Sequence, residues 1–140
     1  MKFLYHASPK KHLTEIQTKR TLSRDLYIGD FVFATSDVRL AAMYLATKGN
    51  AILVNVKTKK PTIVICNNAK DYLLNDKGGA IYRVPGNTFI KSPQEGLEDS
   101  EMVSKVGVTP IDTQVYSGSL DAMKEMGITI YFVNEKYSIK

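Results

Sequence analysis

Several residues with acid, base or hydrogen-bonding side chains fall at the ends of apolar runs in this chain. His6 and Ser8 follow the first run, and Thr35 follows the second. Tyr44 lies in a segment with helical spacing, and Glu101 opens a late apolar run. Polar groups at strand ends are well placed to contact a ligand, and a tyrosine ring suits contact with a planar group. Together with Ser36, which follows Thr35, these residues form the candidate site.

The clearest pattern that positions these residues runs from Gly29 to Tyr44. Phe31–Ala34 is a short apolar run of β-branched and aromatic residues, which predicts a buried strand. Ser36 offers a hydroxyl at an N-cap position, and apolar residues recur at helical spacing from Val38. We therefore expect a core strand that leads into a helix capped by Ser36, with Tyr44 roughly one to two turns along it.

The rest of the chain is predicted to form mainly short strands. They are expected at Phe3–Ala7, Ala51–Val56, Thr62–Cys66, Ala80–Val84, Met102–Val108, Ile111–Tyr116 and Ile128–Val133. Because these strands cluster instead of alternating strictly with helices, the pattern favours an α+β fold over a doubly wound one.

Fewer segments are predicted to be helical. A helical turn is expected at Leu13–Ile16, and helices at Ala69–Asn75 and Ser119–Met126, with Asn67 or Asn68 and Ser119 as their caps and Gly127 ending the last. The polar segments Thr18–Asp25 and Ile90–Asp99 are expected to be loops.

Length and composition indicate one ordinary globular domain spanning residues 1–140. The chain is 44% apolar and 24% charged, and it is long enough to bury a core. Its net charge is +5, yet the 19 basic residues are scattered, whereas a nucleic-acid face would cluster them among aromatic residues. The basic charge therefore favours general surface solvation over nucleic-acid binding.

Cys66 is the only cysteine, which excludes an intramolecular disulfide and a cysteine-based zinc site. It lies in an apolar run, so we expect it in the core. No segment approaches the ~18 apolar residues of a membrane span, and the N-terminus has no apolar stretch typical of a signal peptide. We therefore expect a cytoplasmic protein without membrane contact.

Several common enzyme signatures are missing from the sequence. There is no Gly-x-Gly-x-x-Gly, no P-loop and no nucleophile elbow. The two histidines, His6 and His12, lack metal-ligand spacing with carboxylates. A Rossmann dinucleotide site and a metallohydrolase are therefore disfavoured, and no metal is expected.

Three stretches of the chain resemble motifs of one enzyme family. Leu4–Ser8 is similar to the Leu-x-His-Gly-Ser element that opens the catalytic domain of poly(ADP-ribose) polymerases and related ADP-ribosyltransferases. Phe31–Thr35 with Leu40–Tyr44 resembles a Tyr-Phe-Ala-Asp strand followed by a helix carrying Ser-Ala-Asn-Tyr. Ser100–Val103 resembles the Asn-Glu-Tyr-x element that holds the catalytic glutamate. The small rifampin ADP-ribosyltransferases have a comparable layout at similar length.

This resemblance implies an ADP-ribosyltransferase-like split antiparallel sheet with a few short helices, which binds NAD between two half-sheets. His6 would hydrogen-bond a ribose hydroxyl of the adenosine half, and the Ala7 backbone would hold the nicotinamide carboxamide. Tyr44 would stack on the nicotinamide ring, and Glu101 would hydrogen-bond the 2-hydroxyl of the nicotinamide ribose. The implied NAD-binding residues are His6, Ala7, Ser8, Thr35 and Tyr44, and the implied catalytic residues are Glu101 and His6.

The implied activity is transfer of one ADP-ribose unit from NAD to an acceptor, a pentosyltransferase reaction. Loss of nicotinamide leaves an oxocarbenium-like sugar, and the Glu101 carboxylate would stabilise its positive charge. A second glutamate two residues earlier is replaced by Asp99, so the acceptor stays open between a protein, a nucleic acid and a small molecule.

Two positions depart from the family pattern. Val32 stands where the family has a second stacking tyrosine, and Ala7 stands where it has a glycine. The Ala7 backbone contact survives only if that position needs no positive φ, and Tyr5 or Tyr27 would have to replace the lost ring. A catalytically silent binding module is therefore a second hypothesis. An RNA 2′-phosphotransferase is a third, although His12 is poorly placed as the second histidine of such enzymes.

Each residue of the candidate site also has a structural interpretation. His6 has the pattern of a core histidine with satisfied hydrogen bonds, and Tyr44 that of a packed core ring. Glu101 follows other acidic residues and is equally consistent with the edge of an acidic loop. Thr35 is consistent with an ordinary strand-end hydroxyl. Convergence of His6, Tyr44 and Glu101 on one crevice would favour the functional interpretation.

Overall fold

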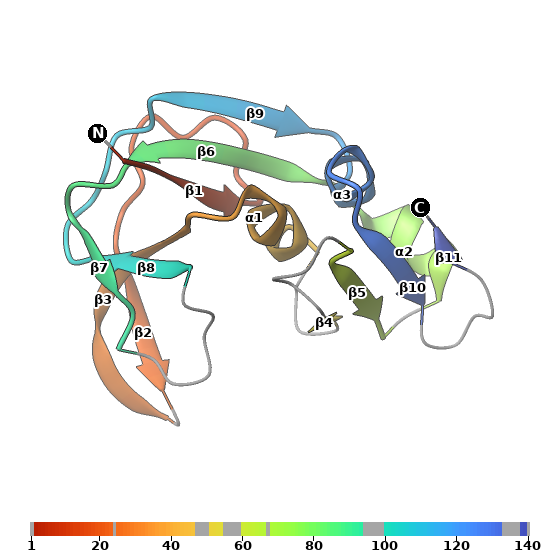
Figure 1. Cartoon of the computed structure of the whole chain (residues 1–140), viewed down its shortest axis with the longest axis horizontal. Helices are drawn as coiled ribbons and strands as arrows, with labels where there is room; N and C mark the ends of the chain where they lie inside the picture. Colours follow the sequence, from red (N-terminus) through yellow and green to blue (C-terminus); the bar gives the residue numbers. More distant parts are fainter. Residues whose placement is uncertain are drawn as a thin grey trace.

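The computed structural model of the chain describes residues 2–23, 25–46, 51–54, 60–66, 68–93, 100–132 and 138–139. Within these ranges it contains two β-sheets and three short helices (Figure 1). The strands are β1 (Phe3–Ser8), β2 (Lys19–Ser23), β3 (Leu26–Thr35), β4 (Ala51–Val54), β5 (Thr62–Ile65), β6 (Gly79–Pro85), β7 (Phe89–Lys91), β8 (Glu101–Ser104), β9 (Asp112–Tyr116), β10 (Thr129–Phe132) and β11 (Ser138–Ile139). The helices are α1 (Val38–Tyr44), α2 (Ala69–Asn75) and α3 (Ser119–Glu125). The predicted α+β class, with a mainly antiparallel sheet and a few short helices, is confirmed.

The larger sheet carries the N-terminal strand near its centre. Its order is β7-β8-β3-β1-β6-β9, with β2 beside β3, and each of these pairs is antiparallel. β1 pairs with β6 at six positions, whereas its register with β3 consists of one pair, Tyr5 with Thr35. The strands β1, β6 and β9 thus form one half of the sheet, and β3, β2, β7 and β8 form the other (Figure 1).

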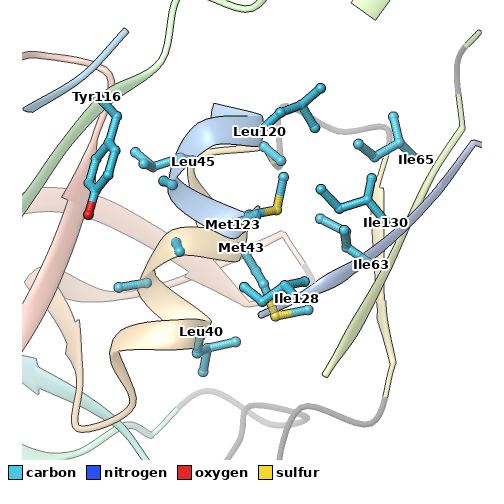
Figure 2. Packing of buried hydrophobic residues seen from close by; sticks show 14 of the residues in the cluster. Leu40, Met43, Leu45, Ile63, Ile65, Tyr116, Leu120, Met123, Ile128 and Ile130 are labelled. Atoms are coloured by element: carbon cyan, nitrogen blue, oxygen red, sulfur yellow. The ribbon is translucent and has the colours of Figure 1, made fainter. Parts of the chain in front are cut away.

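The smaller sheet has the order β11-β10-β5-β4, with β10 and β5 parallel and the other pairs antiparallel. Helices α1 and α3 lie between this sheet and the larger one (Figure 1). Figure 2 shows Met43 of α1 and Met123 of α3 beside Ile63 of β5 and Ile130 of β10. All four side chains are completely buried, so the two helices join the sheets through one apolar core.

A second apolar cluster packs on the opposite face of the larger sheet. Its buried members are Leu4, Ile16, Val32, Ala34, Ala80, Tyr82, Val84, Phe89 and Val108. Side chains alternate between the two faces of a strand. Val32 and Ala34 of β3 therefore share this cluster, while Phe33 and Thr35 project toward the opposite face.

Helix α1 begins directly after β3, as the sequence predicts, but its N-cap is Asp37 and not Ser36. The Asp37 carboxylate accepts the backbone N–H of Arg39 at 3.0 Å and forms an ion pair with its guanidinium at 3.2 Å. A carboxylate also complements the positive end of the helix dipole, which a serine hydroxyl does less well. Ser36 instead donates its backbone N–H to the carbonyl of Ser100 at 3.1 Å.

Two expectations for the N-terminal part are wrong. Leu13–Ile16 forms no helix, because Ile16 is buried and pairs with Val108 in an isolated antiparallel bridge. Thr18–Asp25, expected to be a loop, contains β2, which pairs with β3. A polar, basic strand at the margin of a sheet lacks the alternation of apolar residues by which buried strands are recognised.

The helix ends follow the sequence only in part. Asn68 caps α2 and Gly127, with φ +74°, ends α3, as expected. Ser119, expected to cap α3, is instead its first residue, and Gly118 is the N-cap. The carboxylate of Asp76, which directly follows α2, accepts the backbone N–H of Ser119 at 2.8 Å. The side chain that caps α3 therefore comes from a distant part of the chain.

Three smaller expectations also change. Cys66 is exposed and not in the core, because β5 ends one residue before it. The strand expected at Met102–Val108 is shorter, since β8 ends at Ser104. The loop expected at Ile90–Asp99 begins within β7, and residues 94–99 lie outside the described ranges. In the part of the chain that the structure describes, no helix has the length and apolar character to cross a bilayer.

Candidate functional site

A pocket of about 310 Å³ lies where β1 and β3 diverge. Five residues singled out from the sequence line it: His6 and Ala7 of β1, Thr35 of β3, Tyr44 of α1 and Glu101 of β8. Small-molecule sites usually measure about 300–1,000 Å³. The pocket is therefore large enough for a small ligand or for one end of a larger one.

The single pairing between β1 and β3 explains the opening. Beyond Tyr5, β1 continues to Ser8 paired with β6 alone. The Nδ1 of His6 donates a hydrogen bond to the carbonyl of Phe33 at 2.5 Å, so a side chain satisfies this β3 group. The β3-facing edge of β1 at Ala7 consequently has no paired residue in the register of the two strands. Such an edge can hydrogen-bond an amide of a ligand.

The environment of His6 favours a neutral imidazole. Burial lowers the pKa of His6, the hydrogen bond to the Phe33 carbonyl opposes this effect, and the positive charge of Lys19 lowers the pKa further. With Nδ1 carrying the proton for Phe33, the neutral ring leaves Nε2 as a hydrogen-bond acceptor. Nε2 of His6 is therefore suited to accept a hydrogen bond from a hydroxyl group.

Glu101 and Tyr44 meet directly in the pocket. The Tyr44 hydroxyl donates a hydrogen bond to the Oε1 of Glu101. Glu101 is buried, with only 6% of the residue exposed. The pairing of β3 with β8 places Glu101 opposite Thr35, and α1 brings Tyr44 back over the same strand end. Among the described residues that line the pocket, only Glu101 has a charged side chain at neutral pH. Glu101 therefore brings a carboxyl group to the wall of the pocket.

Thr35 is almost fully buried and its hydroxyl is engaged in two hydrogen bonds. The Oγ1 donates to the Oγ of Ser100 at 3.2 Å and accepts the backbone N–H of Asp37 at 3.1 Å. The single hydroxyl proton is thus used within the protein. Thr35 lines the pocket, but it has no proton left to donate to a ligand.

The two neighbours of His6 along β1 are placed differently. In the described part of the chain, Asp25 is the only residue other than glycine with positive φ, so Ala7 has an ordinary strand conformation. The exchange of glycine for alanine therefore leaves the Ala7 backbone unstrained. Ser8 is buried and is not among the residues that line the pocket; its Oγ accepts the backbone N–H of Lys10 at 3.1 Å.

Sequence reasoning missed one aromatic residue of the pocket wall, Phe33, and named another, Tyr5, without placing it. Val32 is 1% exposed and belongs to the opposite apolar cluster, but the next residue, Phe33, lines the pocket. Tyr5, considered as a replacement ring, also lines it, whereas Tyr27 is 55% exposed at the β2–β3 hairpin. The alternation of β3 side chains, counted from Thr35, was the signal that could have identified Phe33.

Other residues considered from the sequence lie elsewhere. His12 is exposed and does not line the pocket, and Asp99 lies outside the described residues. Among the residues with a described placement, no group of three or more His, Cys, Asp or Glu side chains could hold a metal ion.

The fold and the pocket define a small α+β protein with a ligand-sized opening in its larger sheet. Comparisons with protein-family models, with curated proteins and with solved structures found no match to this chain. Its function therefore has to be inferred from the chemistry of the pocket.

Proposed function

We propose that this protein is an NAD-dependent mono-ADP-ribosyltransferase, which cleaves the nicotinamide–ribose bond and transfers ADP-ribose to an acceptor. The observation that carries the proposal is the convergence of His6, Tyr44 and Glu101 on one pocket. Tyr44 and Glu101 are 57 positions apart in the sequence, yet their side chains are hydrogen-bonded. Three unrelated structural roles would not require these side chains to share one cavity.

The wall of the pocket suits the nicotinamide ring of NAD. This ring is planar and, in the oxidised cofactor, positively charged. Tyr5, Phe33 and Tyr44 supply aromatic side chains, and Glu101 supplies a carboxylate. A cation near an aromatic face is stabilised by about 0.5–2 kcal/mol, more when water is excluded. The edge of β1 at Ala7, which has no partner in the register of β1 with β3, is proposed to hydrogen-bond the carboxamide of the ring.

Glu101 is the proposed catalytic residue. When the bond between the nicotinamide nitrogen and the ribose C1 breaks, the electron pair leaves with nicotinamide, which becomes neutral. Positive charge then develops on the ribose, and a nearby carboxylate stabilises it. The nucleophile of the acceptor forms the new bond to C1 and releases its proton to the solvent. Tyr44 holds one oxygen of the carboxylate while its ring packs against the leaving group.

His6 is proposed to bind the sugar. Its Nε2 accepts a hydrogen bond from a ribose hydroxyl, because Nδ1 is committed to the carbonyl of Phe33. This assignment needs no proton transfer by His6. The imidazole of His6 therefore acts as a binding group, and the Glu101 carboxylate stabilises the positive charge.

Release of nicotinamide from NAD by the wild type and by Glu101→Gln tests the proposal. Loss of the carboxylate charge should slow release on the order of 10²–10³-fold, while NAD binding measured by calorimetry is largely retained. Glu15→Gln, at an exposed position outside the pocket, is the matched control and should behave as wild type. The proposal is wrong if the wild type neither binds NAD nor releases nicotinamide.

A catalytically silent module that binds an ADP-ribose-like ligand is the second candidate. It is favoured by the hydrogen bond from Tyr44 to Glu101, which occupies one carboxylate oxygen of the acid proposed as catalytic. A ligand that binds only the native state raises the melting temperature by mass action. Stabilisation by NAD or ADP-ribose without nicotinamide release would select this function over the transferase.

A further inference from the structure

The start of β8 is attached to the junction of β3 and α1 by side-chain and backbone hydrogen bonds. The Oγ1 of Thr35 donates to the Oγ of Ser100 at 3.2 Å, and the backbone N–H of Ser36 donates to the carbonyl of Ser100 at 3.1 Å. Ser100 is therefore held at two points. The residue that follows it is Glu101.

The same threonine also fixes the beginning of α1. Its Oγ1 accepts the backbone N–H of Asp37, the N-cap residue, at 3.1 Å. Since Tyr44 lies at the end of this helix and donates to Glu101, both partners of the Tyr44–Glu101 hydrogen bond are linked to the Thr35 hydroxyl. The buried hydroxyl of Thr35 thus connects the strand that carries Glu101 with helix α1, which carries Tyr44.

From these contacts we infer that Thr35 is a positioning residue for Glu101, acting through Ser100, instead of the direct NAD contact expected from the sequence. Thr35 is 2% exposed and its hydroxyl proton is used by Ser100. Groups that stabilise a transition state must be held closely, because a displacement of about 1 Å can cost on the order of 100-fold in rate. The role in turnover rests on the proposed transferase function, whereas the positioning of Glu101 does not.

Steady-state kinetics of nicotinamide release distinguish positioning from binding. Thr35→Val keeps the shape of the side chain and removes the hydroxyl, and it should lower kcat by about 10- to 100-fold with KM for NAD within about twofold of wild type. Thr35→Ser restores the hydroxyl and should recover most of kcat. A rise in KM at unchanged kcat would show that Thr35 contacts NAD and would overturn the inference.

A second readout needs no activity. Protein labelled with ¹³C at the glutamate carboxyl carbons gives a signal for Glu101, assigned by its absence in Glu101→Gln. Thr35→Val should shift this signal in the NAD-free protein, Thr35→Ser should leave it near the wild-type position, and Ser100→Ala should shift it as well. Thr21→Val is the matched control, since Thr21 is a buried strand threonine bonded to the carbonyl of Lys19 and does not line the pocket.

The two readouts separate the two proposals. If the wild type releases no nicotinamide, the transferase function fails, and the carboxyl signal still tests the positioning of Glu101. If Thr35→Val does not fold, Ser100→Ala carries the same test from the other end of the hydrogen bond. An unshifted Glu101 signal in the folded variants overturns the inference even if the wild type is an active transferase.

Discussion

His6 illustrates how one hydrogen bond determines the chemistry of a side chain. The carbonyl of Phe33 accepts a hydrogen bond from Nδ1–H, and burial lowers the pKa of the ring. The motif around His6 predicted its position at the end of the first strand, but the tautomer depends on a carbonyl 27 positions away. Glu101 is similar, because its partner Tyr44 comes from a distant helix. At this scale, residue types were predictable and their bonding partners were not.

The lowered pKa of His6 predicts a loss of stability at mildly acidic pH. In the unfolded chain the imidazole takes up a proton near its usual pKa of 6.5, while in the folded protein it resists protonation. The stabilising contribution is complete above pH 6.5 and is lost as the pH falls toward the lowered pKa of the folded state. The loss amounts to at most about 1.4 kcal/mol per pH unit.

Urea unfolding at pH 7.5 and at pH 5.5 measures this effect. The free energy of unfolding of the wild type should fall more steeply between the two pH values than that of His6→Gln, which has no group titrating in this range at position 6. His12→Gln is the control, because His12 is exposed. Equal pH dependence in wild type and His6→Gln would contradict the prediction.

Some secondary-structure elements are determined by local sequence signals, and others depend on contacts between distant residues. The apolar run of β3 and the helix α1 arise where the sequence predicts them, because apolar spacing is a local feature, but β3 already begins at Leu26. The strand β2 was missed because only pairing with β3 makes it a strand. The cap of α3 was also misassigned, because the capping carboxylate belongs to Asp76, 43 positions before Ser119.

Removal of this carboxylate should destabilise the protein. Asp76 accepts the backbone N–H of Ser119 at 2.8 Å, of Leu120 at 3.2 Å and of Gly78 at 3.2 Å. Loss of a helix cap usually costs about 0.5–2 kcal/mol, and we expect Asp76→Ala to lie at the upper end of this range. Chemical unfolding measures it, with the exposed neighbour Lys77→Ala as the control. A loss no greater than that of Lys77→Ala would refute the capping role.

The whole molecule is organised around the layer of α1 and α3 between its two sheets. Met43, Met123, Ile63 and Ile130 belong to one core, through which the smaller sheet and one face of the larger sheet pack against these helices (Figure 2). The same layer closes one side of the pocket, since Tyr44 belongs to α1. Stability and the geometry of the site therefore depend on the same packing.

A core truncation in this layer should destabilise both sheets together. Met123 is completely buried, and its replacement by alanine leaves a cavity that typically costs about 2–5 kcal/mol. Unfolding of Met123→Ala, followed by circular dichroism and by tyrosine fluorescence, should give one shared transition at lower denaturant concentration. Leu74→Ala, at an exposed position of α2, is the control. Separate transitions for the two signals would show that the sheets unfold independently.

The sequence by itself determined the α+β class, the core of β3, the start of α1 and the identity of His6, Tyr44 and Glu101 as candidate site residues. These features follow from short-range spacing and from motif order, which are visible along one stretch of chain. Tertiary structure decided that Phe33 and Tyr5 line the pocket, that Val32 faces the opposite core and that Thr35 is bonded to Ser100. These placements depend on the position at which β1 separates from β3. They could not be predicted from local patterns, because strand pairing is a contact between residues distant in the sequence.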